Sequence, residues 1–594
     1  MPLMKMIRWF VMGAALATGA AFAAGDEWQP AIGPLKTRWA KDVAPGKVWT
    51  EYPRPQMVRK DWLNLNGLWD YTIIDTNVPS PSSYQGKILV PFPVESALSG
   101  VMRRLDEKHH LVYRRTFKLP GSWKGRHVLL QFGAADWQTE VFINSESVGT
   151  HRGGYDPFTF DITTALKSGP VQEILVDIFD PTEGGQPRGK QVRKPEGICY
   201  TPTSGIWQTV WLEPVPELNI VDLFISPDVD HSLVRVVANC NGVGSGDLVE
   251  AVVSENGKEI GRKRGGAWSP LEIPIPHPKL WSPNQPFLYD LKIELRNGHK
   301  RLDAVTSYFA MRKTGLGKDA KGRTRLMLNG EPIFEIGTLD QGFWPDGIYT
   351  APSDTAMRYD IETTKKLGFN MIRKHVKVEP DRWYYYCDKL GMIVWQDMPS
   401  AFLSDAKEDD KEQFEQELRQ LIYTHRNHPC ITTWVLFNEG WGQYDTVRLA
   451  RMLKESDPSR LVDDASGWTD QNVGDLIDMH KYPGPDSPKP ETNRAAVLGE
   501  FGGLGLGVDG HTWAKKTWGY QGMDSRKALT ERYVNLLSKA LELKESAGLS
   551  AAVYTQTTDV ETECNGLMTY DREIVKPDEA AVAAANRKLQ TEGR

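Results

Sequence analysis

Cysteine is scarce in this sequence of 594 residues, and positive charge is not in excess. The five cysteines are scattered, odd in number and form no Cys-x-x-Cys pair. Neither a disulfide framework nor a zinc site is therefore predicted. No run of lysine or arginine occurs, and the formal net charge is −6. These two features make nucleic acid an unexpected partner.

A long apolar run of the kind that spans a membrane is also lacking. Near the N-terminus, Lys5 and Arg8 precede a short apolar stretch, Trp9 to Leu16, and Ala21-Phe22-Ala23 follows as a small-residue cleavage signal. The stretch is too short for a good span, so residues 1–23 are predicted to be a signal peptide. We expect an exported protein, periplasmic or extracellular, with no membrane span after cleavage. An uncleaved anchor is the alternative.

Tryptophan, in contrast, is abundant, at 20 residues. Most are expected to fill hydrophobic cores. The alternative role is to offer sugar-stacking faces, because an indole presents a flat apolar plane with one hydrogen-bond donor.

The length and the pattern of apolar residues predict a multidomain chain. After an N-terminal extension, residues 24–59, many short strands separated by turns fill residues 60–215, which is typical of a β jelly roll. Residues 216–312 continue in strands and suit a smaller, immunoglobulin-like β-sandwich.

Residues 313–594 follow a different rhythm, because strand-like and helical runs alternate. Eight such repeats predict a (β/α)₈ TIM barrel. The predicted strands are IFEIGTL from Ile333, FNMIRKH from Phe369, MIVWQDM from Met392, TTWVLFNE from Thr432, LVDDAS from Leu461, LIDMHKY from Leu476, AAVLGEF from Ala495 and SAAVYTQT from Ser550. The predicted helices include residues 353–366, 411–425, 525–545 and 578–589.

Polar side chains end several of these strands. Glu439 terminates the fourth predicted strand and Glu500 the seventh. Because strand interiors in a barrel are apolar, recurrent polar endings predict a site on the C-terminal rim, where barrels carry their reactive groups. The other candidates on this rim are Asp340, Arg373, His375, Asp397, His480, Tyr482 and Asp559.

Two carboxylates facing each other over a barrel mouth are the groups needed to cleave a glycosidic bond. One gives its proton to the leaving oxygen, and the other, ionised, assists at the anomeric carbon. A separation of about 5–5.5 Å allows direct attack, whereas about 6.5–9.5 Å leaves room for a water molecule. The sequence does not supply this distance.

Neighbouring residues suggest roles, and each has a structural alternative. Asn438 is placed to donate to a sugar 2-hydroxyl. Arg373 is placed to hold a nearby carboxylate ionised, although an Arg373–Glu500 pair also serves as a structural ion pair. Trp344 and Trp441 equally suit a cap over the barrel core.

The chain resembles glycoside hydrolase family 2, the group containing β-galactosidases, β-glucuronidases and β-mannosidases. Residues 133–163 and SGIWQTVWLEPV resemble its sugar-binding jelly roll. Residues 368–399 are similar to its second and third barrel strands, and residues 557–572 to the closing strand and loop. WVLFNEGWG resembles its acid/base signature and GEFGG its nucleophile segment.

This resemblance implies a retaining, double-displacement exo-glycosidase. Glu439 would be the general acid/base and Glu500 the nucleophile. Asn438, Arg373, His375, His480 and Tyr482 would line the subsite for the terminal sugar, with Asp340, Trp344 and Asp397 on the same rim. The expected partner is the end of an oligosaccharide or polysaccharide.

Departures from the family pattern bear on the substrate. β-Glucuronidases of the family hold the sugar carboxylate with an Asn-x-Lys near the eighth strand, where this chain has Asn565-Gly566-Leu567. Tyr554 stands where many relatives have tryptophan. The expected activity is β-galactosidase-like. The alternatives are α-L-arabinopyranosidase activity, β-glucuronidase-type specificity and an inactive carbohydrate-binding protein. No cofactor is predicted, and a divalent cation and the oligomeric state stay open.

Overall fold

The computed structural model describes residues 28–244, 246–401 and 407–591. The predicted signal peptide, residues 1–23, lies outside the described residues. Within those ranges, no helix combines the length and apolar character needed to cross a membrane.

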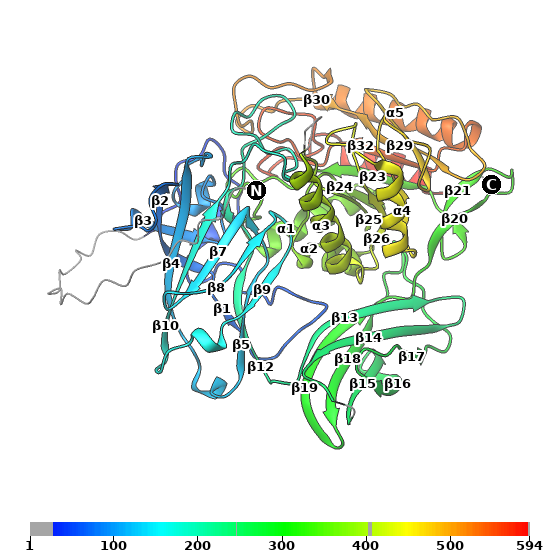
Figure 1. Cartoon of the computed structure of the whole chain (residues 1–594). Helices are drawn as coiled ribbons and strands as arrows, with labels where there is room; N and C mark the ends of the chain where they lie inside the picture. The colour runs from blue at the N-terminus through cyan, green and yellow to red at the C-terminus, as the bar shows by residue number, and fades with distance from the viewer. Residues whose placement is uncertain (1–27, 245, 402–406, 592–594) are drawn as a thin grey trace.

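The N-terminal domain is an antiparallel β-sandwich of the jelly-roll type, drawn in blue and cyan in Figure 1. One sheet contains, in spatial order, β1 (Leu63–Asn64), β12 (Val210–Val215), β5 (His127–Phe132) and β9 (Phe158–Asp161). The other contains β3 (Gly86–Val90), β2 (Gly67–Asp75), β4 (His109–Lys118), β10 (Val171–Phe179), β7 (Gln138–Ile143) and β8 (Glu146–Arg152). A short pair, β6 (Ala135–Asp136) and β11 (Gly205–Ile206), lies at its end. Alternate apolar residues, such as Ile174, Val176 and Ile178 of β10, fill the space between the sheets.

The second domain is the predicted immunoglobulin-like sandwich. Its first sheet contains β13 (Asn219–Asp228), β14 (Leu233–Asn241) and β17 (Leu271–Pro274). Its second sheet contains β16 (Lys258–Gly266), β15 (Asp247–Glu255), β18 (Tyr289–Asn297) and β19 (Lys300–Phe309). A small sheet of β20 (Thr314–Lys318), β21 (Thr324–Leu328) and β22 (Glu331–Pro332) then leads into the third domain.

The third domain is the predicted TIM barrel. Its eight parallel strands are, in chain order, β23 (Glu335–Asp340), β24 (Met371–Lys374), β25 (Ile393–Asp397), β26 (Ile431–Val435), β27 (Leu461–Asp463), β28 (Leu476–Lys481), β29 (Ala495–Gly502) and β32 (Ala551–Thr555). Each coincides with one of the eight predicted runs, so the predicted fold class is confirmed. Most of these strands are buried along their whole length, because helices cover the outside and side chains fill the inside.

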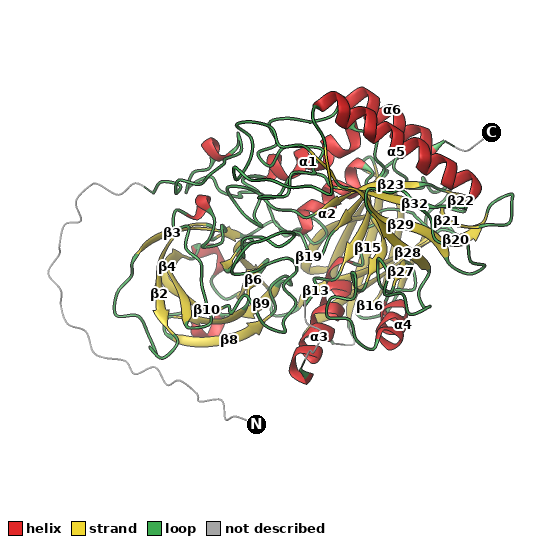
Figure 2. Cartoon of the chain, turned by 90° about the horizontal axis from the view of Figure 1, so that it is seen from above, coloured by secondary structure: helices red, strands yellow, loops and turns green. Residues whose placement is uncertain are grey.

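Six α-helices lie around the described part of the barrel (Figure 2). They are α1 (Asp354–Lys366), α2 (Asp381–Leu390), α3 (Glu408–His425), α4 (Thr446–Ser456), α5 (Arg526–Ser546) and α6 (Glu579–Gln590). No helix joins β27 to β28 or β28 to β29, and β27 and β28 are the two ends of the hydrogen-bonded order. The barrel therefore has a seam between β27 and β28, which is crossed by the loop of residues 464–475.

The N-terminal extension packs against the other domains. Thr37 donates from its backbone N–H and its hydroxyl to Asp346 of the barrel, at 2.8 and 2.7 Å. The Trp49 indole donates to the Ala351 carbonyl. Arg59 forms a buried ion pair with Asp303 of the second sandwich. This segment therefore links the three domains.

Candidate active site

Glu439 lies beyond the end of its strand. β26 ends at Val435, four residues earlier than the predicted run, because the chain turns away from the ladder after that point. Asn438 then bridges to Ser466, whose carbonyl accepts from the Glu439 N–H at 2.9 Å. Glu439 itself has a φ of 53°, a left-handed conformation uncommon for residues other than glycine and often found at functional sites. The result is a fixed carboxylate at the barrel mouth.

Glu500 approaches from the other side of the mouth and lies within β29. One carboxylate oxygen of Glu500, one of Glu439 and one ring nitrogen of His480 lie within 4.8 Å of one another. The predicted pair is thus brought together. An upper limit of 4.8 Å between the nearer oxygens favours the shorter of the two carboxylate separations, about 5–5.5 Å, at which one group attacks directly.

His480 lies between the two carboxylates. Its Nδ1 is 2.7 Å from Glu439 Oε1 and 3.6 Å from Glu500 Oε2. Its Nε2 is 2.8 Å from the Ser466 hydroxyl, which donates to Asp478 at 2.5 Å. Burial alone would lower the pKa of His480, but the negative charge of Glu500 and the hydrogen bond to Glu439 raise it. The raised pKa favours the form in which both ring nitrogens carry protons.

Arg373 organises the inner wall of the site and is fully buried. Its guanidinium forks onto Asp397 at 3.1 and 3.0 Å. It also donates to Asn438 Oδ1 at 2.8 Å and to Glu500 Oε1 at 3.3 Å. A planar guanidinium can hold several acceptors in one geometry. The Asn438 Nδ2 donor, in contrast, is buried and has no partner in the described part of the chain, which leaves it for a ligand hydroxyl.

Glu500 is held ionised. Burial alone would raise its pKa, but the charges of His480, Arg373 and Lys190 outweigh burial and lower the pKa to about 2. The Tyr482 hydroxyl donates to Glu500 Oε2 at 2.5 Å, which also stabilises the charged form. This carboxylate has the protonation state of a nucleophile.

Asp397 and His375 form the next layer. Asp397 Oδ2 lies 2.9 Å from His375 Nδ1 and accepts from the Val376 N–H. Burial lowers the pKa of His375 well below its usual value, so this imidazole is neutral. Asp397 thus orients both His375 and Arg373, and acts on a ligand through them.

Three predicted rim residues are placed elsewhere. Asp340 forms an ion pair with Lys374 at 2.8 Å, and Lys374 also pairs with Glu379. Trp344 is buried under the Arg572 guanidinium, 3.9 Å from its ring centroid, and packs on the core. Neither contacts the carboxylate pair through any bond recorded among the described residues. Asp559, similarly, pairs with Lys576.

The sequence interpretation missed Lys190, which comes from the jelly-roll domain. This buried ammonium lies 5.8 Å from the Trp441 ring and 6.0 Å from the Tyr200 ring, and its charge acts on Glu500. Within the described residues no carboxylate forms an ion pair with it. Nothing in the sequence around residues 180–204 indicates that this loop reaches the barrel.

A metal ion is poorly suited to the cluster. Among the described residues, Glu439, His480 and Glu500 are the one group with three ligand-type atoms close enough to share an ion. An imidazole must be neutral to bind a metal. The raised pKa of His480, together with the Arg373 guanidinium beside Glu500, instead favours proton transfer and charge stabilisation.

Three family models match the chain in the same order as its domains. They are the sugar binding domain of "Glycosyl hydrolases family 2" over residues 90–212, the family 2 domain over residues 218–312, and the family 2 TIM barrel domain over residues 350–500. The chain belongs to glycoside hydrolase family 2.

Curated glycosidases are similar over two thirds of this chain. A β-galactosidase of Thermoanaerobacter pseudethanolicus is 26% identical over 428 residues, covering 67% of this chain and 55% of the relative. A β-glucuronidase of Bacteroides fragilis is 26% identical over 438 residues, covering 67% of this chain and 60% of the relative. The chain thus spans little more than half the length of these relatives.

Solved glycosidase structures share the architecture. A β-glucuronidase from Ruminococcus gnavus superposes with a TM-score of 0.71 at 17% identity, covering 91% of this chain and 100% of that one. A putative β-galactosidase from Bacteroides fragilis also has a TM-score of 0.71, at 20% identity, covering 90% and 86%. At these identities the likeness shows the fold alone.

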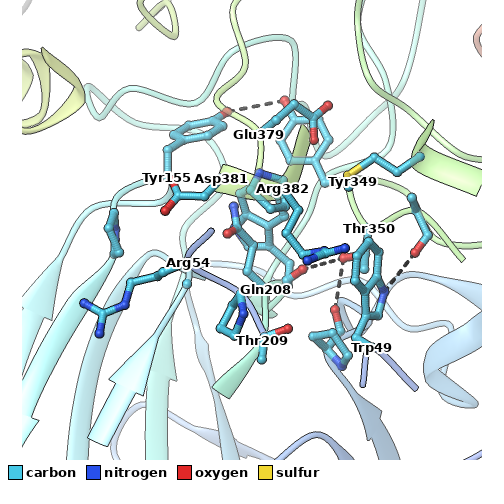
Figure 3. Close-up of a pocket in the computed structure, with 18 of the residues that line it drawn as sticks. Trp49, Arg54, Tyr155, Gln208, Thr209, Tyr349, Thr350, Glu379, Asp381 and Arg382 are labelled. Atoms are coloured by element: carbon cyan, nitrogen blue, oxygen red, sulfur yellow. Dashed lines mark hydrogen bonds between the residues drawn. The ribbon is translucent and has the colours of Figure 1, made fainter. Parts of the chain in front are cut away.

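A separate pocket lies between the jelly roll and the barrel (Figure 3). Aromatic residues of the jelly roll, the barrel and the N-terminal extension line it, including Tyr155, Tyr349 and Trp49. Its volume of about 60 Å³ is small, and neither Glu439 nor Glu500 lines it. The carboxylate pair therefore lies outside this mostly apolar pocket.

Proposed function

We propose that the protein is a retaining exo-glycosidase that hydrolyses a terminal β-linked sugar. The observation that carries the proposal is the pair of carboxylates, Glu439 and Glu500, with oxygens within 4.8 Å across the barrel mouth. The names of the curated family 2 relatives, β-galactosidase and β-glucuronidase, support the same class of reaction.

The first step uses both carboxylates. Ionised Glu500 attacks the anomeric carbon, and a carbon–oxygen bond forms as the glycosidic bond breaks. Glu439 gives its proton to the departing oxygen, which leaves as an alcohol. Asn438 donates to the sugar 2-hydroxyl, a contact that strengthens as positive charge develops on the ring.

The second step reverses these roles. Glu439 takes a proton from water, the hydroxide oxygen bonds to the anomeric carbon, and Glu500 leaves as a carboxylate. Glu439 is then protonated again. The anomeric configuration is inverted twice and therefore retained.

Labelling tests the proposal directly. A 2-deoxy-2-fluoro glycoside with a good leaving group should trap a covalent adduct on a peptide that contains Glu500. Glu500→Gln should abolish hydrolysis of aryl glycosides while the protein stays folded. An adduct on another residue, or turnover by Glu500→Gln, would contradict the assignment. Turnover by the wild type separates the enzyme from an inactive carbohydrate-binding protein.

The terminal sugar is proposed to be galactose, with α-L-arabinopyranose as an alternative that shares its ring configuration. Asn565 lies where β-glucuronidases of the family have the asparagine of the Asn-x-Lys that holds the sugar carboxylate. Its side chain is hydrogen-bonded to Glu563 and Gln556, and Leu567 stands in place of the lysine. This arrangement disfavours a glucuronide held in the usual way.

A terminal uronide is nevertheless the second candidate, because Lys190 places a buried cation without a carboxylate partner in the described site. Comparing kcat/KM on the nitrophenyl β-D-galactoside, α-L-arabinopyranoside and β-D-glucuronide distinguishes the three. The substrate with the highest value identifies the sugar.

We propose that the protein acts outside the cytoplasm, in the periplasm or the medium. The charged start, apolar stretch and Ala21-Phe22-Ala23 signal support this proposal. Fractionation of cells that express the full chain, with N-terminal sequencing of the exported form, should find cleavage after Ala23. Retention of the intact chain in the cytoplasm would contradict it.

A further inference from the structure

Trp468 is 66% exposed, although tryptophan is mostly buried in folded proteins. A single exposed aromatic residue is ordinary on a protein surface. Trp268, in the second sandwich, is 58% exposed and has no catalytic group near it in sequence or fold. The position of Trp468, rather than its exposure alone, carries the inference.

Trp468 lies at the mouth beside the proposed proton donor. Its ring centroid is 5.7 Å from that of His480, with the ring planes at 78°. His480 in turn contacts Glu439. The preceding residue, Gly467, has a φ of 110°, and a Cβ there would lie 3.3 Å from Glu439 Cγ. Only glycine lets the backbone that carries Trp468 approach the acid so closely.

The loop that carries Trp468 is anchored on both sides. Before it, the Ser466 N–H donates to the Phe437 carbonyl at 2.9 Å. After it, the Thr469 carbonyl accepts from Gln443 at 3.0 Å, and Asp470 forms a forked ion pair with Arg494 at 2.7 and 3.0 Å. The exposed indole is therefore held in place by its backbone, so binding a ligand costs little ordering of the loop.

We propose that Trp468 is the platform of a leaving-group subsite, on which the pyranose ring next to the scissile bond stacks. This inference rests on the proposed function. The sugar to be released occupies the inner, buried side with Asn438 and Arg373, so the departing oxygen faces Glu439. Atoms beyond that oxygen emerge on the outer side, where Trp468 lies. The flat apolar face of an indole fits the carbon–hydrogen face of a pyranose. The proposed substrate is therefore a saccharide with a second sugar ring, not a glycoside of a small alcohol.

A pair of substrates with the same terminal sugar tests the subsite. A glycosyl fluoride has a leaving group of one atom, whereas the disaccharide requires the second ring. Trp468→Ala should lower kcat/KM on the disaccharide about tenfold or more, the scale of a lost apolar pocket contact. Its kcat/KM on the fluoride should stay within about twofold of wild type. Trp468→Phe, which keeps a flat apolar ring, should recover most of the disaccharide activity.

Trp268→Ala is the matched control, since it removes an equally exposed tryptophan far from the site. It should leave kcat/KM unchanged on both the fluoride and the disaccharide. Equal losses of Trp468→Ala on the fluoride and the disaccharide would assign Trp468 a structural role and overturn the proposal. Unchanged activity on both would do the same. If the wild type hydrolyses neither substrate for any terminal sugar, the proposed function fails first.

Discussion

Glu500 and Lys190 come from different domains, yet the charge of Lys190 contributes to lowering the pKa of Glu500. Lys190 is one of the positive groups that lower the pKa of Glu500 to about 2. Burial raises the pKa of Glu500, and without Lys190 less positive charge counteracts this effect, so the pKa should rise. Lys190→Met should therefore shift the acidic limb of the kcat/KM–pH profile to higher pH, because that limb reports ionisation of the proposed nucleophile in the free enzyme.

Lys194→Met is the control for this shift, since Lys194 is exposed on the same loop. Its pH profile should match that of the wild type. Coincident acidic limbs for Lys190→Met and wild type would show that Lys190 does not act on Glu500.

Arg373 offers a second prediction at the residue scale. Arg373→Met leaves the buried Asp397 carboxylate without its forked partner. Breaking one side of a buried ion pair costs roughly 3–5 kcal/mol of unfolding free energy, which urea denaturation should measure. Arg448→Met, at a half-exposed ion pair with Glu415, should cost roughly 0–1 kcal/mol. Equal losses for the two variants would contradict the role given to Arg373.

Most residues at the site could be predicted, because strand ends in a barrel share one rim. Strand position does not fix the direction of a side chain, however. The sequence therefore predicts Asp340 and Trp344 on the rim with the carboxylate pair, whereas the structure places them against Lys374 and Arg572. Lys190 could not be predicted, since its contact depends on how two domains pack.

At the scale of elements, the eight strands could be predicted because each is a short apolar run bounded by turns. Ends were less certain. The sequence predicts a fourth strand that reaches Glu439, because Leu436 and Phe437 are still apolar. In the structure β26 ends at Val435. The missing helices beside β28 reflect loops, residues 464–475 and 482–494, that have no continuous amphipathic pattern.

β29 carries a prediction of its own. Gly502, two residues after Glu500, has a φ of 91°, and a Cβ there would lie 2.3 Å from the Tyr554 ring. Gly502→Ala should cost roughly 1–3 kcal/mol of unfolding free energy, as in overpacked cores, and should lower kcat by displacing the strand that holds Glu500. Gly522 has open space around its Cα, so Gly522→Ala should change stability by less than about 1 kcal/mol. Thermal unfolding and initial rates measure both. Wild-type stability and kcat in Gly502→Ala would show that β29 accommodates the added methyl group, and would contradict the prediction.

For the whole molecule, domain order could be predicted from composition and strand spacing, whereas domain packing could not. The N-terminal extension illustrates the limit. Its contacts, such as that of Thr37 with Asp346, join segments more than 300 residues apart, and no local sequence pattern predicts such contacts.

The pH dependence of stability belongs to this scale. Glu95 is buried in the jelly roll, accepts from the Ser204 N–H, and has its pKa raised by burial from 4.5 to about 8. Between these values the folded state keeps a proton that the unfolded state has lost, so stability falls as pH rises. The Tm of the wild type should therefore decrease from pH 5 to pH 9.

Glu95→Gln should reduce that decrease, because glutamine does not titrate. Glu146→Gln, at an exposed position of the same domain, should leave it unchanged. A decrease in Tm of the same size in Glu95→Gln would assign the pH dependence to other groups.

The seam between β27 and β28 has a consequence for how this architecture can diversify. The loop that crosses it carries Trp468 and touches Glu439, and it bridges to Asn438 only at Ser466, near its start. A longer or shorter segment after Ser466 would interrupt no pairing of the barrel strands and displace none of the described helices. If the proposed subsites are right, the architecture separates an inner wall that binds the terminal sugar from an outer border whose length can change without altering the barrel strands.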